Sequence, residues 1–241
     1  MRINRFLARA GVASRRGAEP LVLGGRVTIN GETVTDLATK VDPENDRVEV
    51  DGAAVRLPDR HTYVLLNKPA GYVVTMSDPQ GRPTVADIAP DLPSGVVPVG
   101  RLDVGTEGLL IMTDDGELAH RIAHPSFELD KVYDVVAEGE LAEAQRMRLE
   151  TGVELDGRTT FPATVRVVEV GSGRTVAEMT IHEGRKRQVR RMFELVGHRV
   201  LELRRTRVGP VSMGGLTTGS FRRLTEEEVK ALRAAVGLDA D

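Results

Sequence analysis

Apolar positions at the start of the chain follow a helical spacing. The segment INRFLARA (residues 3–10) places apolar side chains at intervals of three and four residues, and Gly11 follows it, so we expect a helix that ends at this glycine. Ser14 is a natural N-cap for a second helix in SRRGAEPLVL, although Gly17 and Pro20 within that segment weaken it. The pattern therefore predicts two short helices.

The apolar pattern then changes to the alternation that is typical of strands. RVTINGETV predicts two strands joined by an Asn-Gly turn, and VDPENDRVEVDG predicts a further turn and strand. These elements would form a compact αα-β module over residues 1–52. The segment that begins AAVRLPDRH predicts a linker over residues 53–62.

Longer apolar runs, mixed with helical patterns, begin at Tyr63. The expected strands are YVLLNKP, GYVVTM, VVPVG, GLLIMT, KVYDVVAEG, TFPATVRVV and RTVAEMTIHEG. The expected helices are GELAHRIA, LAEAQRMRLE, RKRQVRRMFELVG and TEEEVKALRAAVG. Because the strands outnumber the helices and do not alternate strictly with them, we expect an α+β fold, with a mixed, largely antiparallel sheet over residues 63–241.

The composition is that of an ordinary globular protein, with 40% hydrophobic and 29% charged residues. No window approaches the ~18 apolar residues that a membrane helix needs, and the N-terminus lacks the apolar block of a secretory signal. We therefore expect a cytoplasmic protein with no membrane partner. Cysteine and tryptophan are absent and aromatic residues make up 3% of the chain, which excludes disulfides and Cys-based zinc sites and argues against an aromatic sheet that stacks RNA bases.

Two clusters of basic residues stand out, although the formal net charge is −3. Residues 1–30 contain six arginines and one acidic residue, and residues 185–207 contain nine basic residues and two acidic ones. Either cluster alone is equally compatible with an ordinary solvated surface. Two clusters in separate parts of the chain favour contact with the phosphates of a nucleic acid.

Common phosphate and calcium motifs are absent or incomplete. The Gly-x-Gly in EVGSGRT joins two predicted strands with no helix after it, and there is no Gly-Lys-Ser/Thr loop. DPENDRVEVDGA has the acids of a calcium loop, but Arg47 stands where that loop requires glycine and Ala53 where it requires glutamate. These patterns favour turns over binding sites.

A metal site is a weak alternative. His120 and His124 are four residues apart on a predicted helix, which is a metal-ligand spacing, and Glu117 is near enough to be considered a third ligand. His124 precedes Pro125 and therefore belongs at the end of the helix, where a partial positive charge is favourable in any case. The structural interpretation is favoured, and no metal is expected.

The segment GRKRQVRRMFELVGHRV predicts a strongly basic helix. Lys186, Arg190 and Phe193 share one side of it, and Arg187 and Arg191 share another. A helix this basic is expected to lie on a polyanion or to pair with acids, and one of its arginines could turn inward and hold a carboxylate ionised. The expected buried stripe consists of Val189, Met192, Phe193 and Val196.

Several of these segments together resemble the bacterial ribosomal pseudouridine synthases that modify a single uridine in ribosomal RNA. GRLDVGTEGLLIMTDDGELAHRIAHPSFELDKVYDV resembles the signature segment of that family. LLNKPAGYVVTMSDPQGRPTVADI and EGRKRQVRRMFELVGHRVLELRRTRVG resemble its first and last catalytic-domain motifs. MRINRFLARAGVASRR with GRVTINGETV resembles the S4-type RNA-binding module that precedes the catalytic domain. The resemblance runs from about residue 2 to residue 223.

The resemblance implies roles for particular residues. Asp103 matches the aspartate on which the chemistry of the family depends, and Tyr133 matches an aromatic residue that packs against the target base. Arg190 matches the arginine that pairs with the catalytic carboxylate, and Ile181 would line the same pocket. Arg101 and the small residues after Asp103 would let an RNA backbone approach. The family needs no metal and no organic cofactor.

Basic residues in both parts of the chain are candidates for contact with RNA. They are Arg2, Arg5, Arg15 and Arg16 in the first module, and Lys186, Arg187 and Arg191 in the basic helix. A carboxylate at Asp103 can attack carbon or remove a proton, so attack at C1′, addition at C6 and removal of the 2′ proton all stay open.

Three functions remain possible from the sequence. The preferred one is a monomeric pseudouridine synthase acting on 23S rRNA, at a uridine in a structured loop near the peptidyl-transferase region, with 16S rRNA as the second choice. The second is a non-catalytic S4-type ribosome-assembly factor, which would have no need of Asp103, Tyr133 and Arg190 together. The third and weakest is a metal-dependent RNA hydrolase that uses His120 and His124.

Overall fold

The computed structural model describes residues 1–238, and within it the chain forms two compact units. The first unit contains residues 1–63, 91–97 and 113–115. Of the described residues, the second contains 64–90, 98–112 and 116–238. No helix among the described residues is both long enough and apolar enough to span a membrane.

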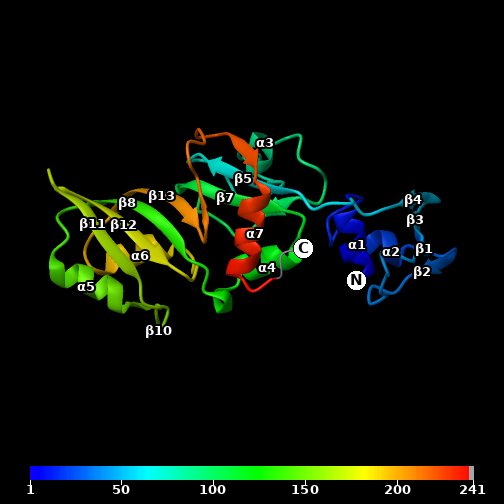
Figure 1. Ribbon diagram of the computed structural model, residues 1–241, viewed down its shortest axis with the longest axis horizontal. Coiled ribbons are helices and arrows are strands. Elements are labelled where there is room, and N and C mark those ends of the chain that lie inside the picture. The colour runs from blue at the N-terminus through cyan, green and yellow to red at the C-terminus, as the bar shows by residue number, and fades with distance from the viewer. Residues whose placement is uncertain (239–241) are drawn as a thin grey trace. The chain divides into compact units, whose positions relative to one another are not determined.

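The first unit contains two short helices and a four-stranded antiparallel sheet in the order β2-β1-β3-β4 (Figure 1). The helices pack their apolar stripes on the sheet through Ile3, Phe6, Leu7 and Val22, all of which are buried. The strand β4 lies within the segment expected to be a linker, so regular structure extends to Val55. The elements are α1 (Ile3–Arg9), α2 (Glu19–Leu23), β1 (Val27–Ile29), β2 (Glu32–Val34), β3 (Val48–Val50) and β4 (Ala53–Val55).

The second helix begins later than the sequence suggested. The Ser14 hydroxyl accepts a hydrogen bond from the backbone N–H of Gly17 (3.0 Å) in a turn, so Ser14 caps the turn and not the helix. The helix α2 starts at Glu19, which places Pro20 in its first turn, where its missing N–H would have no partner in any case. The helix is therefore shorter than the segment SRRGAEPLVL, as Gly17 and Pro20 suggested, and the expected N-cap at Ser14 was wrong.

The second unit is built on a nine-stranded mixed sheet, as the α+β class predicts. Its main path is β11-β12-β8-β13-β7-β5-β15, with β14 beside β13 and β6 beside β7 (Figure 1). The pairings of β11 with β12, β12 with β8 and β8 with β13 are antiparallel, whereas β13 and β7 run parallel. The strands are β5 (Tyr63–Lys68), β6 (Val97–Pro98), β7 (Glu107–Thr113), β8 (Lys131–Glu138), β11 (Thr164–Gly171), β12 (Arg174–Ile181), β13 (Val200–Val208), β14 (Val211–Ser212) and β15 (Phe221–Arg223).

Among residues 1–238, five helices, a short 3₁₀ turn and a small hairpin accompany this sheet. The predicted stripe of α6 is buried, since Val189, Met192, Phe193 and Val196 are each at most 6% exposed. Thr225 caps α7 as expected, because its hydroxyl accepts from the N–H of Glu228 and its own N–H donates to that carboxylate. These elements are α3 (Val85–Ile88), α4 (Gly116–Ala123), η1 (Pro125–Phe127), α5 (Glu143–Thr151), α6 (Gln188–Leu195), α7 (Glu226–Ala235), β9 (Glu154–Leu155) and β10 (Arg158–Thr159).

The sheet differs from the sequence prediction in several segments: one expected strand is absent, and β13, β14 and β15 were not expected. The segment GYVVTM is a loop with a single bridge between Val73 and Thr84, because Gly71 takes a left-handed φ of 88° that interrupts extended structure. The strand β13 was not predicted, because its sequence VLELRRTRV is dominated by polar residues. It nevertheless lies between β8 and β7, where its Leu203 and Arg205 are buried.

Gly108 permits the close contact between β7 and β13. It lies opposite Arg205 in the parallel pairing and has a φ of 103°. A Cβ atom at this position would lie 2.2 Å from the carbonyl oxygen of Arg205. Only glycine fits here, so the glycine of the TEGLL segment sets how closely β13 approaches β7.

Candidate active site

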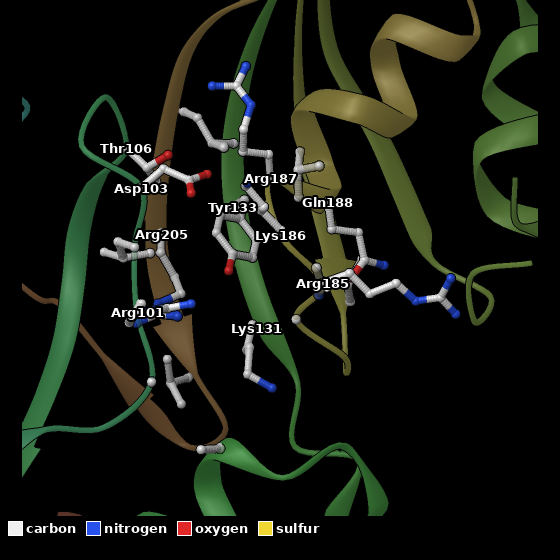
Figure 2. Close-up of a pocket in the computed structure, with 18 of the residues that line it drawn as sticks. Arg101, Asp103, Thr106, Lys131, Tyr133, Arg185, Lys186, Arg187, Gln188 and Arg205 are labelled. Atoms are coloured by element: carbon white, nitrogen blue, oxygen red, sulfur yellow. Dashed lines mark hydrogen bonds between the residues drawn. The ribbon is translucent and has the colours of Figure 1, made fainter. Parts of the chain in front are cut away.

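A pocket of about 300 Å³ opens in the second unit at the ends of several strands. Asp103 and Thr106 lie on the loop between β6 and β7, Tyr133 on β8, and Lys186 and Arg187 on the chain that leads into α6 (Figure 2). The pocket therefore collects side chains from segments that are far apart in the sequence. Its charged lining residues are Arg101, Asp103, Lys131, Arg185, Lys186, Arg187 and Arg205.

Asp103 is partly exposed and is the one acidic side chain that lines the pocket. Its backbone carbonyl accepts a hydrogen bond from the N–H of Thr106 (3.0 Å), which closes a tight turn over residues 103–106. Within residues 1–238, no hydrogen bond or ion pair of its carboxylate is found. The carboxylate is therefore held by its backbone and is available to a ligand.

Two cations hold the three peptide carbonyls that follow Asp103. The Nζ atom of Lys68 donates to the carbonyl oxygens of Val104 (3.3 Å) and Thr106 (2.9 Å), and also to that of Pro69 (2.8 Å). Between them, the carbonyl oxygen of Gly105 accepts from Nη2 of Arg190 (2.7 Å). Since each carbonyl has a charged donor, the loop that carries Asp103 is fixed in one conformation.

Lys68 is fully buried, and burial lowers its pKa to about 8. The negative charges of Glu107 and Asp103 oppose this shift. An ammonium with three carbonyl partners uses all of its donors, which is what a buried lysine requires. Sequence reasoning missed Lys68, although it lies within the predicted strand YVLLNKP.

Arg190 does not form the direct ion pair with Asp103 that was expected. Its two terminal nitrogens are used by the carbonyls of Gly105 and Val200, the latter at 3.0 Å from Nη1. It still interacts electrostatically with Asp103. Burial and the neighbouring Arg187 lower the pKa of Arg190, and the charge of Asp103 opposes that shift. Arg190 therefore supports Asp103 in two ways: it holds the loop that carries Asp103, and its positive charge attracts the carboxylate.

Tyr133 and Ile181 form an apolar wall of the pocket, and both are buried. Lys131 lies two residues before Tyr133 on β8 and so faces the same side of the strand. Its Nζ atom donates to the carbonyl oxygens of Leu129 (3.1 Å) and His182 (3.3 Å). Burial, followed by the charge of Arg205, lowers the pKa of Lys131 to about 8. Since side chains two residues apart face the same side of a strand, the assignment of Tyr133 to the site could have identified Lys131 as a second site residue on β8.

Arg205 is a second pocket residue that sequence reasoning missed. It is buried, its Nε donates to the carbonyl oxygen of Leu109 (2.8 Å), and it lines the same pocket as Arg101 (Figure 2). Arg101 itself is exposed, as expected for a residue that meets a ligand. Only knowledge that β13 borders β7 would have placed Arg205 here.

A buried carboxylate organises the basic loop on the opposite wall. Glu183 accepts from Nε of Arg185 (2.9 Å) and from Nε2 of Gln188 (2.7 Å), and Oε1 of Gln188 accepts from the N–H of Arg185 (2.9 Å). Arg187 then adopts a left-handed φ of 53°, a strained conformation for arginine. This frame presents Lys186 and Arg187 at the pocket.

The other residues predicted to bind RNA lie elsewhere. Arg191 makes two hydrogen bonds to the exposed carboxylate of Asp156 (2.8 and 2.7 Å) and does not line the pocket. The four arginines of the first unit that were predicted to bind RNA are exposed, and no acidic side chain among residues 1–238 forms an ion pair with them. They are Arg2, Arg5, Arg15 and Arg16.

The candidate metal ligands do not form a metal site. The rings of His120 and His124 lie 5.1 Å apart and both contact the ring of Phe127, while Glu117 pairs with Arg121 (3.1 Å). Across the described part of the chain, no group of three or more potential ligands that could hold a metal is found. The two histidines therefore belong to an aromatic cluster.

The arrangement suits a planar, uncharged ring attached to negatively charged groups. A rigidly held carboxylate meets a tyrosine ring and an isoleucine, and six cationic side chains surround them. Such a site can neutralise phosphates while its single carboxylate acts as a base or as a nucleophile.

Comparisons with known proteins agree with this geometry. The family described as RNA pseudouridylate synthase matches residues 62–195, and the S4 domain family matches residues 1–57. A protein of Aquifex aeolicus named as an uncharacterized RNA pseudouridine synthase is 47% identical over 99% of this chain and 96% of its own length.

Two further proteins are similar over nearly the whole chain. Ribosomal large subunit pseudouridine synthase B of Bacillus subtilis is 42% identical over 97% of this chain and 96% of its own length. A crystal structure of a pseudouridylate synthase covers 96% of this chain and 99% of its own, with a TM-score of 0.70 and 31% sequence identity.

Proposed function

The chain belongs to the RNA pseudouridylate synthase family, with an S4 domain before the synthase domain, and from this premise we propose that it isomerises one uridine of 23S rRNA to pseudouridine. The full-length similarity to an enzyme named for the large ribosomal subunit favours 23S over 16S rRNA. We expect the protein to act as a monomer in the cytoplasm.

The proposed reaction conserves all atoms of the nucleotide. The N1–C1′ bond breaks, the uracil turns, and C5 joins C1′; the proton on C5 is then lost and N1 gains one. Asp103 would drive the first step, either by attack on carbon or by removal of the 2′ proton, because it is the carboxylate in the pocket. No metal or organic cofactor enters this scheme.

The placement of Asp103 opposite Tyr133 in one cation-lined pocket carries this proposal (Figure 2). The uridine must leave its stack to reach such a pocket, and unstacking costs a few kcal/mol. Tyr133 and Ile181 would cover the flipped base and recover part of that cost. Arg101, Lys186 and Arg187 would hold the deformed backbone through its phosphates.

The test is pseudouridine mapping on 23S and 16S rRNA that lack the modification. Each RNA is incubated with the protein, and carbodiimide-dependent stops of reverse transcription are recorded. One new stop in 23S rRNA is the expected result. A stop only in 16S rRNA would reassign the substrate, and a stop only in immature particles would place recognition in the assembling subunit.

The alternative is a ribosome-assembly factor in which the synthase domain is only a scaffold. It predicts tight RNA binding and no new stop on either RNA or on particles. That outcome would overturn the proposed activity.

The lowered pKa of Lys68 predicts opposite effects of pH on stability and on turnover. Between about 8 and 10.5 the unfolded chain binds more protons at this residue than the folded chain, so its contribution to the free energy of unfolding rises with pH, by at most about 1.4 kcal/mol per pH unit. Over the same range the neutral amine has only two N–H donors for its three carbonyls, so kcat should fall.

Urea unfolding and single-turnover assays at pH 7.5, 8.5 and 9.5 test this, with Lys68→Met as the reference. Relative to the variant, the free energy of unfolding of the wild type should rise above pH 8 and its kcat should fall toward that of the variant. If the wild-type protein and Lys68→Met give parallel pH profiles, Lys68 does not titrate in this range and the loop is held in another way.

A further inference from the structure

Phe161 is the most exposed aromatic side chain of the described residues, and the proposed reaction does not use it. It lies between β10 and β11 and is 47% exposed, compared with 37% for Phe221 and 8% for Tyr133. The chain contains five phenylalanines, three tyrosines and no tryptophan, so a ring left in solvent is uncommon in this protein.

The backbone around Phe161 is fixed although its ring is not buried. Its N–H donates to the buried carboxylate of Glu183 (3.0 Å). Thr160 before it is buried and exchanges two hydrogen bonds with Val153 (2.8 and 3.0 Å), and the N–H of Ala163 donates to the carbonyl oxygen of Glu150 (3.0 Å). The ring is therefore presented by a rigid loop, and little entropy is lost when it binds a partner.

The ring of Phe161 is paired with His182, which adjoins the pocket wall. Their centroids lie 5.0 Å apart at an angle of 47°. His182 follows Ile181, which lines the pocket, and its carbonyl oxygen accepts from Lys131, another pocket residue. The aromatic pair thus lies one residue beyond the wall that would cover the flipped base.

The basic loop before α6 is tied to the same carboxylate. Glu183 binds the N–H of Phe161 through Oε1 and Nε of Arg185 through Oε2, and Gly184 to Gln188 line the pocket. Arg185 also donates to the carbonyl oxygens of Arg158 (2.8 Å) and Thr159 (2.8 Å), so a cation of the pocket lining reaches the segment that carries Phe161. Cationic side chains beside a solvent-facing ring are the combination that binds single-stranded nucleic acid.

We propose that Phe161, backed by His182, is a stacking site for an unpaired nucleobase of the substrate RNA, next to the flipped uridine in sequence. The inference rests on the proposed function, since the RNA must first place a uridine in the pocket. A base that leaves the helix with its neighbour loses its stacking partners, and the ring of Phe161 replaces one of them. The site selects an unstacked base of any kind, because every base has an aromatic face.

The first test compares Phe161→Ala with Phe161→Tyr on the mapped rRNA fragment. The alanine variant should raise KM about tenfold with kcat unchanged, and the tyrosine variant should behave as the wild type, because it keeps the ring. Val168→Ala, an exposed apolar position on β11, is the matched control and should have no effect. An unchanged KM in Phe161→Ala overturns the proposal.

The second test identifies the base. Each nucleotide beside the target uridine is replaced in turn by an abasic residue, and KM is measured with the wild type and with Phe161→Ala. At one position, the abasic residue should raise the KM of the wild type about tenfold and leave the KM of Phe161→Ala almost unchanged, because that variant already lacks the ring on which the base would stack. Additive losses at every position would show that Phe161 contacts a part of the RNA other than a base, such as a ribose, and would overturn the proposal.

The two proposals fail differently. If no pseudouridine forms with the wild-type protein, the proposed function is wrong. If pseudouridine forms with the same KM in the wild type and in Phe161→Ala, only the stacking site is wrong.

Discussion

Replacing Asp103 with asparagine should lower the rate of pseudouridine formation by about a thousandfold or more, because the amide can neither attack carbon nor accept a proton. The side chain keeps its size, and the turn over residues 103–106 is closed by backbone atoms. We therefore expect the free energy of unfolding to be unchanged within about 0.5 kcal/mol. The rate is measured in single-turnover reactions on the mapped rRNA fragment.

RNA affinity separates a catalytic role from a structural one. Asp103 is the one acid among six cations of the pocket, so its neutralisation should leave the Kd for RNA unchanged or make it tighter. Asp156→Asn is the matched control, because that exposed carboxylate pairs with Arg191 outside the pocket. Substantial activity of Asp103→Asn, or equal losses in both variants, would contradict the assigned role.

The second large effect is expected from Arg190→Lys, which should lower kcat about a hundredfold with little change in KM. A guanidinium reaches the carbonyls of Gly105 and Val200 with separate nitrogens, and a single ammonium cannot reproduce that fork. Loss of the contact to Gly105 would free the loop of Asp103, and a displacement of ~1 Å can cost about a hundredfold in rate.

The next residue provides a matched control for this variant. Arg191 binds the exposed carboxylate of Asp156 and lies outside the pocket, so Arg191→Lys should change kcat by less than about threefold. If both variants lose activity equally, the effect comes from the charge of α6 and not from the contact with Gly105. Full activity of Arg190→Lys would mean that Lys68 alone fixes the loop.

Local patterns predicted much of the fold. The alternation in KVYDVVAEG and RTVAEMTIHEG identified β8 and β12, and the continuous apolar run GLLIMT identified β7. The spacing of Val189, Met192 and Phe193 identified the buried side of α6. These predictions succeeded because side-chain period and turn chemistry depend only on neighbours in the sequence.

Predictions failed where the decisive contact is not local. The composition of β13, with many polar residues, is typical of an edge strand or a loop. The strand nevertheless lies inside the sheet, between β8 and β7. The burial of Arg205 follows from that position and from Gly108 beside it. Neither fact can be read from the pattern of VLELRRTRV.

The sequence by itself determined the family resemblance, the α+β class, and Asp103, Tyr133, Ile181 and Arg190 as candidate site residues. Only the tertiary structure decided what these residues touch. The helical period placed Arg190 and Arg191 on different sides of α6. It could not say which of the two contacts the loop of Asp103, because Arg190 and its partner Gly105 are 85 residues apart in the sequence.

Lys68 and Arg205 illustrate the same physical reason. Lys68 supports the carbonyls of Val104 and Thr106 across 36 and 38 residues, and Arg205 reaches Leu109 across 96. A hydrogen bond over such separations depends on the order and direction of the strands, which no local period encodes. The sequence therefore determined the candidate groups of this active site, and the packing of β7 against β13 and of α6 against the Asp103 loop decided how they are held.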